Sequence, residues 1–296
     1  MASRPILVGA SGSEQSLRAV QWAAHEAALR SVPLKIVSVV RSGPGASWCA
    51  PRDAHPATLL QAAAETVEDA AASASMSAPG LTIDTSLLTG DPGPVLAGLG
   101  RRASMLVAGS RTAAGTGRLV PGSVSRYLAV HAPCPVVVQR DPAAPAQQVV
   151  VGVRELADSE APLAFAFEEA FHRGAHLLVV QAWHWLPPAG LPTADRTLTP
   201  AELSAHAVTR LHSLLEPWRD KYPGVEVGEE IIHAHPGHAL ASLTATADLL
   251  VLGRRVRPIG WTDAPLGSAT QAVLALAHGP VAIVPEEFAG LPGADD

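Results

Sequence analysis

The stretch from Gly109 to Ser123 contains the residue types of an anion-binding loop. An apolar, strand-like run from Met105 to Ala108 leads into it, and a helix-like segment from Val124 to Val130 follows it. In this order of strand, loop and helix, glycine lets backbone amides approach a phosphate, and the N-terminus of the helix adds a partial positive charge. Glycine-rich turns also follow strands for packing alone, so the loop by itself leaves both interpretations open.

Three histidines, His233, His235 and His238, form a second group of residues with ligand chemistry. Imidazoles at the spacing His-x-His-x-x-His could bind zinc. No cysteine or other obvious fourth ligand lies nearby in the sequence. A titrating polar cluster is therefore the favoured interpretation, and we expect no metal site here.

The sequence contains no recognisable catalytic set. It lacks a Gly-x-Ser-x-Gly elbow, a Walker lysine and paired carboxylates at the expected ligand end. In the first half of the chain, Asp91 is the only acid with a fixed position near that end. Because a single acid is a poor basis for hydrolysis, we expect a protein that is not an enzyme.

The composition is that of a globular protein with a sizeable core. Of 296 residues, 48% are hydrophobic and 16% are charged, and the formal net charge is −6. No basic run exceeds two residues, so we expect no nucleic-acid partner. The two cysteines exclude a disulfide framework and fit a reducing compartment. The start of the chain has no signal-peptide core, and no apolar segment reaches about 18 residues, so we expect a cytoplasmic protein without membrane contact.

Landmark residues recur once along the chain at a nearly constant offset. Gly9 matches Gly152, and Leu106–Gly109 matches Leu250–Gly253, which gives offsets of 143 and 144 residues. Matches that begin near residues 91, 122 and 135 continue the series with offsets of 144 or 145. The sequence therefore predicts two copies of one domain, residues 1–140 and 148–290, joined by a short Pro/Ala linker at residues 141–147.

Strands and helices are expected to alternate within each copy. Ser13 is expected to cap the first helix, Gly174 to end the corresponding helix of the second copy, and Pro217 to kink or stop a later helix. The apolar stripe between Leu163 and Phe171 is expected to be buried. In the first copy, apolar runs predict strands at 6–8, 34–40, 81–88, 105–108 and 135–138. This alternation predicts an α/β fold, with a mostly parallel sheet and helices on both faces.

These features resemble the universal stress protein family in its tandem two-domain form, over almost the whole chain. The resemblance rests on Gly-x-x-Gly-Ser at Gly9–Ser13, on the late motif Gly-x2-Gly-x9-Gly-Ser/Thr from Gly109 to Ser123, and on the closing segment from His131 to Val138. It implies that each copy is a Rossmann-like (adenine nucleotide alpha hydrolase-like) domain with a five-stranded parallel sheet of order 3-2-1-4-5. It also implies that the two copies pair through their last strands, residues 136–139 against 281–284.

The resemblance further implies a nucleotide site in the first copy, at the carboxyl ends of the strands, where open α/β sheets usually bind ligands. The ligand would be ATP or a related adenine nucleotide, with Mg²⁺ only as a companion of ATP. Two residues depart from the family pattern, because Ser11 replaces an aspartate that contacts the nucleoside and Thr112 replaces the second glycine of the late motif. The residues assigned to this site are Ala10, Ser11, Val39 (against adenine), Gly109, Arg111, Thr112, Gly122, Ser123 and Val124.

The second copy departs further from the family pattern. Arg154 stands at the aspartate position, where a guanidinium cannot accept a hydrogen bond, and Val256 stands at the second glycine. Arg254, Arg255 and Arg257 follow its fourth strand, where they could hold an anion or could form an ordinary solvated loop. The equivalent site residues are Arg154, Gly253, Arg255, Gly267 and Ser268.

The sequence thus favours a stress-response protein that binds an adenine nucleotide in the first copy without catalysis, and that signals through nucleotide occupancy to a partner it does not name. A second hypothesis is a nucleotide-free scaffold in which both sites have decayed. A weak nucleotide hydrolase is the third and lowest-ranked hypothesis. The sequence also leaves open that two chains form a homodimer, in addition to the pairing of the two domains within one chain.

Overall fold

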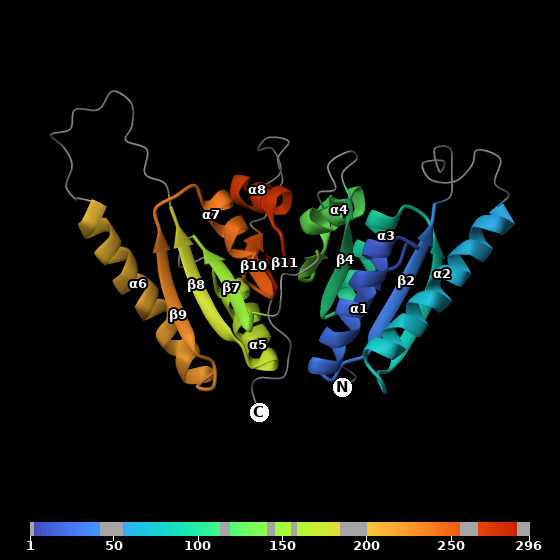
Figure 1. Cartoon of the computed structure of the whole chain (residues 1–296), viewed down its shortest axis with the longest axis horizontal. Coiled ribbons are helices and arrows are strands. Elements are labelled where there is room, and N and C mark those ends of the chain that lie inside the picture. Colours follow the sequence, from blue (N-terminus) through green and yellow to red (C-terminus); the bar gives the residue numbers. More distant parts are fainter. Residues whose placement is uncertain are drawn as a thin grey trace, which may run out of the picture. The chain divides into compact units, whose positions relative to one another are not determined.

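The computed structural model describes residues 3–41, 56–112, 119–140, 146–154, 159–183, 200–254 and 266–288. The chain divides into two compact units (Figure 1). Unit 1 comprises Met1–Asp141 together with Pro280–Asp296, and unit 2 comprises Pro142–Gly279. Each unit is described by itself.

Unit 1 alternates strands and helices, as the sequence predicts. Its last strand comes from the end of the chain, after the whole of unit 2. The elements are β1 (Ile6–Gly9), α1 (Glu14–Leu29), β2 (Leu34–Val40), α2 (Pro56–Ser77), β3 (Ile83–Thr89), α3 (Pro92–Leu99), the 3₁₀ turn η1 (Gly100–Arg102), β4 (Met105–Thr112), β5 (Leu119–Pro121), α4 (Ser123–His131), β6 (Val136–Gln139) and β11 (Val281–Pro285).

The strands of unit 1 follow the expected order. The order β3-β2-β1-β4-β6 is parallel throughout and corresponds to 3-2-1-4-5. At the edge, β11 pairs antiparallel with β6, with Val281 opposite Val138 and Ile283 opposite Val136. The predicted pairing of the two closing strands is therefore confirmed. This pairing covers an apolar strand edge that would otherwise invite aggregation.

One strand of unit 1 is longer than the sequence suggested. The strand expected to end at Ala108 continues as β4 to Thr112, and β5 turns back to pair antiparallel with it, with Ser110 opposite Pro121. Both ends of the glycine-rich stretch are therefore strand rather than loop. Residues 113–118 between them lie outside the described part of the chain.

Unit 2 repeats the alternation of unit 1. Its parallel strands have the order β9-β8-β7-β10, which corresponds to 3-2-1-4. The elements are β7 (Gln148–Val153), α5 (Glu160–Arg173), β8 (His176–Ala182), α6 (Pro200–Lys221), β9 (Val227–Ile232), α7 (Pro236–Leu243), β10 (Leu249–Arg254) and α8 (Ser268–Leu276).

Local sequence signals place most helix ends. The Ser13 hydroxyl accepts a hydrogen bond from the Ser16 amide at 3.2 Å and so caps α1 as predicted. Gly174 ends α5 in the left-handed conformation, with φ 58°, which glycine adopts without a steric penalty. Pro217 does not stop α6, because the helix continues to Lys221.

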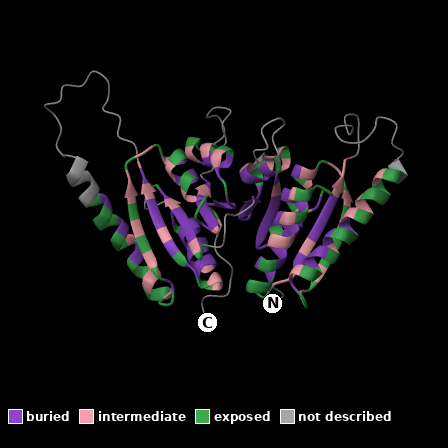
Figure 2. Ribbon diagram, viewed as in Figure 1, coloured by how far each residue is buried: buried purple, intermediate pink, exposed green. Residues whose placement is uncertain are grey.

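The strands carry the core of each unit (Figure 2). β6 is buried along its whole length, as expected for parallel strands covered on both faces. The stripe on α5 is buried at Leu163 and Phe167, but Phe171 is 57% exposed, so its predicted burial is wrong. Phe171 instead lies near the end of α6, with its ring 6.1 Å from that of Tyr222.

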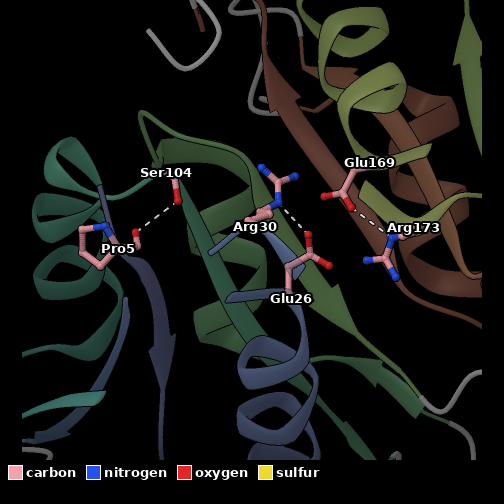
Figure 3. Close-up of polar contacts among 6 residues, drawn as sticks. All are labelled: Pro5, Glu26, Arg30, Ser104, Glu169 and Arg173. Atoms are coloured by element: carbon pink, nitrogen blue, oxygen red, sulfur yellow. Dashed lines mark hydrogen bonds and ion pairs between the residues drawn. The ribbon is translucent and has the colours of Figure 1, made fainter. Parts of the chain in front are cut away.

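Each unit also contains a buried ion pair at the end of its first helix (Figure 3). Glu26 of α1 and Arg30, the C-cap residue of that helix, lie 2.6 Å apart, and both side chains are almost fully buried. Glu169 and Arg173 lie 3.1 Å apart at the corresponding positions of α5. Because each pair has i,i+4 spacing, one helix turn places the two charges together.

Candidate functional site

The carboxyl ends of the parallel strands of unit 1 form the edge at which the predicted site residues gather. The Ala10 amide donates to the Val37 carbonyl at 2.9 Å, which places the end of β1 beside β2. The Gly90 amide donates to the Val40 carbonyl at 2.9 Å, which places the end of β3 beside β2. Ala10 is buried, whereas Val39 is half-buried and packs against the core. Both therefore lie at the edge that the sequence assigned to the nucleoside.

A network of serines holds the turn after β1. The Ser11 amide donates to the Ser16 hydroxyl at 2.9 Å, and the Ser16 hydroxyl donates to the Gly9 carbonyl at 3.2 Å. The exposed hydroxyls of Ser11 and Ser13 lie 3.2 Å apart. Ser11 is thus accessible at the edge, although its hydroxyl already has a neighbour with which it shares a hydrogen bond.

Gly109 is required by the packing of β4 against α1. A Cβ atom at this position would lie 2.8 Å from the Gln15 carbonyl oxygen and 3.2 Å from the Ser16 amide nitrogen. The Gly109 carbonyl also accepts a hydrogen bond from the Ser125 hydroxyl at 2.7 Å, which joins β4 to α4. This glycine therefore has a structural role in addition to any role toward a ligand.

Gly122 has no comparable packing role. Its φ of −69° and ψ of 172° suit any residue, and among the described residues only the Ser125 hydroxyl, at 3.9 Å, lies within 4 Å of a Cβ built there. It occupies the N-cap of α4, where Ser, Thr, Asp or Asn would satisfy a backbone amide better. The first helical hydrogen bond runs from the Arg126 amide to the Gly122 carbonyl, so the preceding amides have no partner inside the helix. Such a helix start favours an anion nearby.

The remaining predicted residues of unit 1 lie along the same strand and helix. Arg111 is exposed on β4, Ser123 is exposed at the first turn of α4, and Val124 packs against the core. Thr112 is the last residue of β4, and its side chain lies outside the described part. The sequence reasoning missed Ser110, whose buried hydroxyl has no hydrogen-bond partner in the described part of the chain. Its place inside the Gly109–Ser123 motif was the available signal.

An ion pair that the sequence did not single out also lies at this edge. Arg41 follows β2, and its guanidinium lies 3.5 Å from the carboxylate of Asp91. Asp91 is the N-cap of α3, but its side chain makes no capping hydrogen bond. The one acid that the sequence placed near the ligand end is thus paired with a base across the ends of neighbouring strands.

In unit 2, four of the five predicted site residues are described. Arg154 is exposed just beyond β7, Gly253 is half-buried near the end of β10, and Gly267 and Ser268 are exposed at the start of α8. Arg255 and Arg257 lie outside the described residues, as does Val256. Arg254 is 8% exposed, so it is not the solvated surface residue of the alternative interpretation.

The three histidines do not converge on a metal-binding arrangement. The His233 ring lies 4.5 Å from that of Trp183, and the rings of His235 and His238 lie 5.3 Å apart. Within the described ranges, no three His, Cys, Asp or Glu side chains are grouped so that they could hold a metal ion. The structure thus presents the histidines as an aromatic and polar cluster at the end of β9.

Comparison with known proteins covers both units. The model of the universal stress protein family matches residues 2–140 and again residues 145–285. Universal stress protein Rv2005c of Mycobacterium tuberculosis H37Rv is 32% identical over 291 residues, which cover 94% of this chain and 96% of the relative. A universal stress protein of Mycolicibacterium smegmatis is 31% identical over 290 residues, with 94% and 96% covered.

A solved structure supports the fold independently. The crystal structure of a universal stress protein from Archaeoglobus fulgidus covers 97% of this chain and 100% of its own, with a TM-score of 0.68 at 18% identity. In the part of the chain that the structure describes, no helix has both the length and the apolar composition of a membrane span. The two family matches and the full-length relatives show that the chain belongs to the universal stress protein family, with two tandem domains.

Proposed function

We propose that unit 1 binds ATP or a related adenine nucleotide without catalysis, and that the protein acts in a stress response through nucleotide occupancy. The observation that carries the proposal is the N-terminus of α4. Packing does not require glycine at Gly122, yet the position lacks the capping side chain that would stabilise the helix. A phosphate that approaches the backbone amides explains both features.

The proposal assigns a part of the nucleotide to each element of the edge. The phosphates would lie at the first turn of α4, with the Ser123 hydroxyl and the exposed Arg111 as further donors. The ribose would lie beside Ala10 and Ser11, and the adenine against the half-buried Val39. The buried Ser110 hydroxyl, which has no hydrogen-bond partner among the described residues, would be a further donor.

Two carboxylates near the edge favour binding over hydrolysis. Glu14 is paired with Arg18 at 2.7 Å, and Asp91 is paired with Arg41 at 3.5 Å. Each carboxylate is thus already engaged by a guanidinium group. We therefore expect phosphate release from ATP to stay at background.

Calorimetry with ATP tests the proposal, with Gly122→Val as the disabling variant. We expect saturable binding by the wild-type chain and at least about tenfold weaker binding by Gly122→Val, because a branched side chain would block the amides. Gly98→Val is the matched control, since Gly98 is exposed on α3 with open space around it. No detectable binding at millimolar ATP, or equal loss in both variants, would contradict the proposal.

A second candidate is a nucleotide-free scaffold, and the serine network favours it. The Ser11 amide and hydroxyl already interact with Ser16 and Ser13, so the turn after β1 is complete without a ligand. Mass spectrometry of small molecules released from freshly purified protein separates the two functions. Absence of any nucleotide, together with a stable protein partner, would select the scaffold.

A further inference from the structure

We propose that unit 2 contains a separate anion site, formed by Arg154 and Arg254, which binds a phosphate group rather than a nucleoside. Arg254 is the last residue of β10, and Arg154 directly follows β7. The sequence alone left Arg254 as either an anion ligand or a solvated residue. Because Arg254 is buried in the structure, it is not a solvated residue.

Strand register brings the two arginines together. β10 and β7 are parallel neighbours whose pairing runs as far as Leu252 opposite Gly152. Continued for two more residues, this register would place Arg254 opposite Arg154, the first residue after β7. Neighbouring strands lie about 4.8 Å apart, so the two backbones at these positions are adjacent. The Gln181 side-chain amide donates to the Arg154 carbonyl at 3.0 Å, which fixes the backbone just beyond β7.

The face of the sheet on which Arg254 lies follows from its neighbours in β10. A Cβ at Gly152 would lie 2.8 Å from Leu252 and 2.9 Å from Leu240 of α7, so this register pair faces α7. Because side chains on a strand alternate with a period of two, Arg254 points to the same face as Leu252. Its guanidinium is therefore placed between the sheet and its helical cover at the carboxyl edge.

Comparison of the two copies shows that the carboxyl edge of the sheet carries different charges in unit 2 and in unit 1. Arg154 and Arg254 take the places of Ser11 and Ser110 of unit 1, and His235 takes the place of Asp91. Unit 2 thus gains two guanidinium groups and loses one carboxylate at positions that in unit 1 border the proposed nucleotide site. A ribose hydroxyl needs an acceptor, which arginine cannot provide, whereas a phosphate needs donors.

Two arginines that follow neighbouring strands, Arg254 buried and Arg154 exposed, favour a multiply charged oxyanion. An anion bound between like charges on neighbouring strands reduces their repulsion. Both arginines also make contacts within the chain, so the anion would join an existing network. Planar guanidinium groups bind phosphate oxygens in pairs, which matches a phosphate or diphosphate group.

Titration with inorganic pyrophosphate, followed by calorimetry and by thermal denaturation, tests this site. The Gly122→Val background removes the proposed nucleotide site of unit 1, so failure of one proposal does not imply failure of the other. We expect saturable binding and a raised Tm in this background, with binding about tenfold weaker after Arg154→Gln. Arg154 is exposed, so this variant should fold even if Arg254→Gln does not.

Arg210→Gln is the matched control, because Arg210 is an exposed arginine on α6 and the charge change is the same. Binding that depends on Arg154 but not on Arg210 supports the site. ATP binding with the same dependence identifies a nucleotide tail as the source of the phosphate, and pyrophosphate binding alone identifies a free diphosphate. Absence of saturable pyrophosphate binding, or equal losses in the Arg154 and Arg210 variants, would overturn the proposal.

Discussion

At the scale of single residues, the two glycines of the Gly109–Ser123 motif have different physical origins. Gly109 is needed because α1 passes within van der Waals distance of β4, whereas Gly122 has open space and an ordinary backbone conformation. The sequence treats both as parts of one phosphate loop. Only the packing distances separate the glycine that the fold requires from the glycine that a ligand would require.

This difference predicts opposite effects of alanine at the two positions. Gly109→Ala should lower the free energy of unfolding by about 1–3 kcal/mol, because the new methyl group overlaps the Gln15 carbonyl of α1. Gly122→Ala should leave it within about 0.5 kcal/mol of the wild type. Urea denaturation followed by circular dichroism measures both values. Similar stability of the two variants would show that the close approach of α1 to β4 is easily relieved.

Ser11 is a residue whose position could be predicted but whose environment could not. The alignment of the two copies places it at the carboxyl end of β1, and the structure confirms an exposed hydroxyl there. Its contacts with Ser13 and Ser16 arise because α1 begins within a few residues and turns its capping serine back toward the strand. These contacts depend on side-chain geometry that the sequence pattern does not specify.

At the scale of elements, a single carboxylate attaches the beginning of unit 2 to its sheet. Asp248 lies just before β10, and its carboxylate accepts hydrogen bonds from the amides of Ala146 at 2.9 Å and Gln148 at 3.2 Å. The Asp248 amide in turn donates to the Gln148 carbonyl at 2.9 Å. In unit 1, Ser104 has the corresponding position and donates to the Pro5 carbonyl through its amide and its hydroxyl (Figure 3). In both copies, a residue just before the fourth strand thus holds the start of the first strand in place through hydrogen bonds.

We predict that Asp248→Ala lowers the free energy of unfolding by about 1–3 kcal/mol, because two backbone amides lose a charged acceptor. Asp248→Asn should cost less, since its amide oxygen can still accept one of the two bonds. Asp84→Ala is the control, because Asp84 forms an exposed ion pair with Lys35 and should contribute less than about 1 kcal/mol. Equal effects in chemical denaturation of Asp248→Ala and Asp84→Ala would refute the anchoring role.

The aromatic cluster at the end of α6 is a second element-scale feature. The Phe167 ring lies 5.6 Å from that of Trp218 and 5.5 Å from that of Tyr222. Unit 1 has alanine at each of the three corresponding positions. Burial raises the pKa of the Tyr222 hydroxyl, and the negative charge of Glu168 raises it further. The two copies therefore fill the space beside their first helices with side chains of very different size on a similar backbone.

At the scale of the whole molecule, the order of strands in space departs from their order in the sequence. β11 follows every element of unit 2 along the chain, yet it belongs to unit 1, where it pairs with β6. The edge of the unit 1 sheet is therefore completed by a segment more than one hundred residues away in the sequence. The repeat alone suggests only that this segment closes the second copy.

We predict that Ala282→Pro destabilises unit 1, although the residue follows unit 2 in the sequence. Ala282 lies inside β11, opposite Val137 of β6, where proline lacks a backbone N–H and is not tolerated within a sheet, at a cost on the order of 3 kcal/mol. Hydrogen exchange should show faster exchange of the amides in β6, from Val136 to Gln139. Arg210→Gln, an exposed substitution on α6 of unit 2, serves as the control. Unchanged protection of β6 in Ala282→Pro would contradict the assignment of β11.

The sequence by itself determined the family, the duplication, the alternation of strands and helices, and most helix ends. These features depend on local periodicity, on capping residues such as Ser13 and Gly174, and on landmarks that recur at a constant offset. It also predicted that the residues assigned to the site of unit 1 gather at the carboxyl edge of its sheet. Each of these inferences needs only neighbours along the chain, or a comparison of one copy with the other.

The tertiary structure alone decided which polar groups are buried and which residues meet across strands. Ser110 and Arg254 are buried, and Arg41 meets Asp91 because the ends of β2 and β3 lie side by side. The register of β7 with β10, from which the Arg154–Arg254 site is inferred, is likewise set by the packing of entire strands. Burial and cross-strand contact are properties of residues distant in sequence, so their physical origin lies in the packed sheet and not in any single segment.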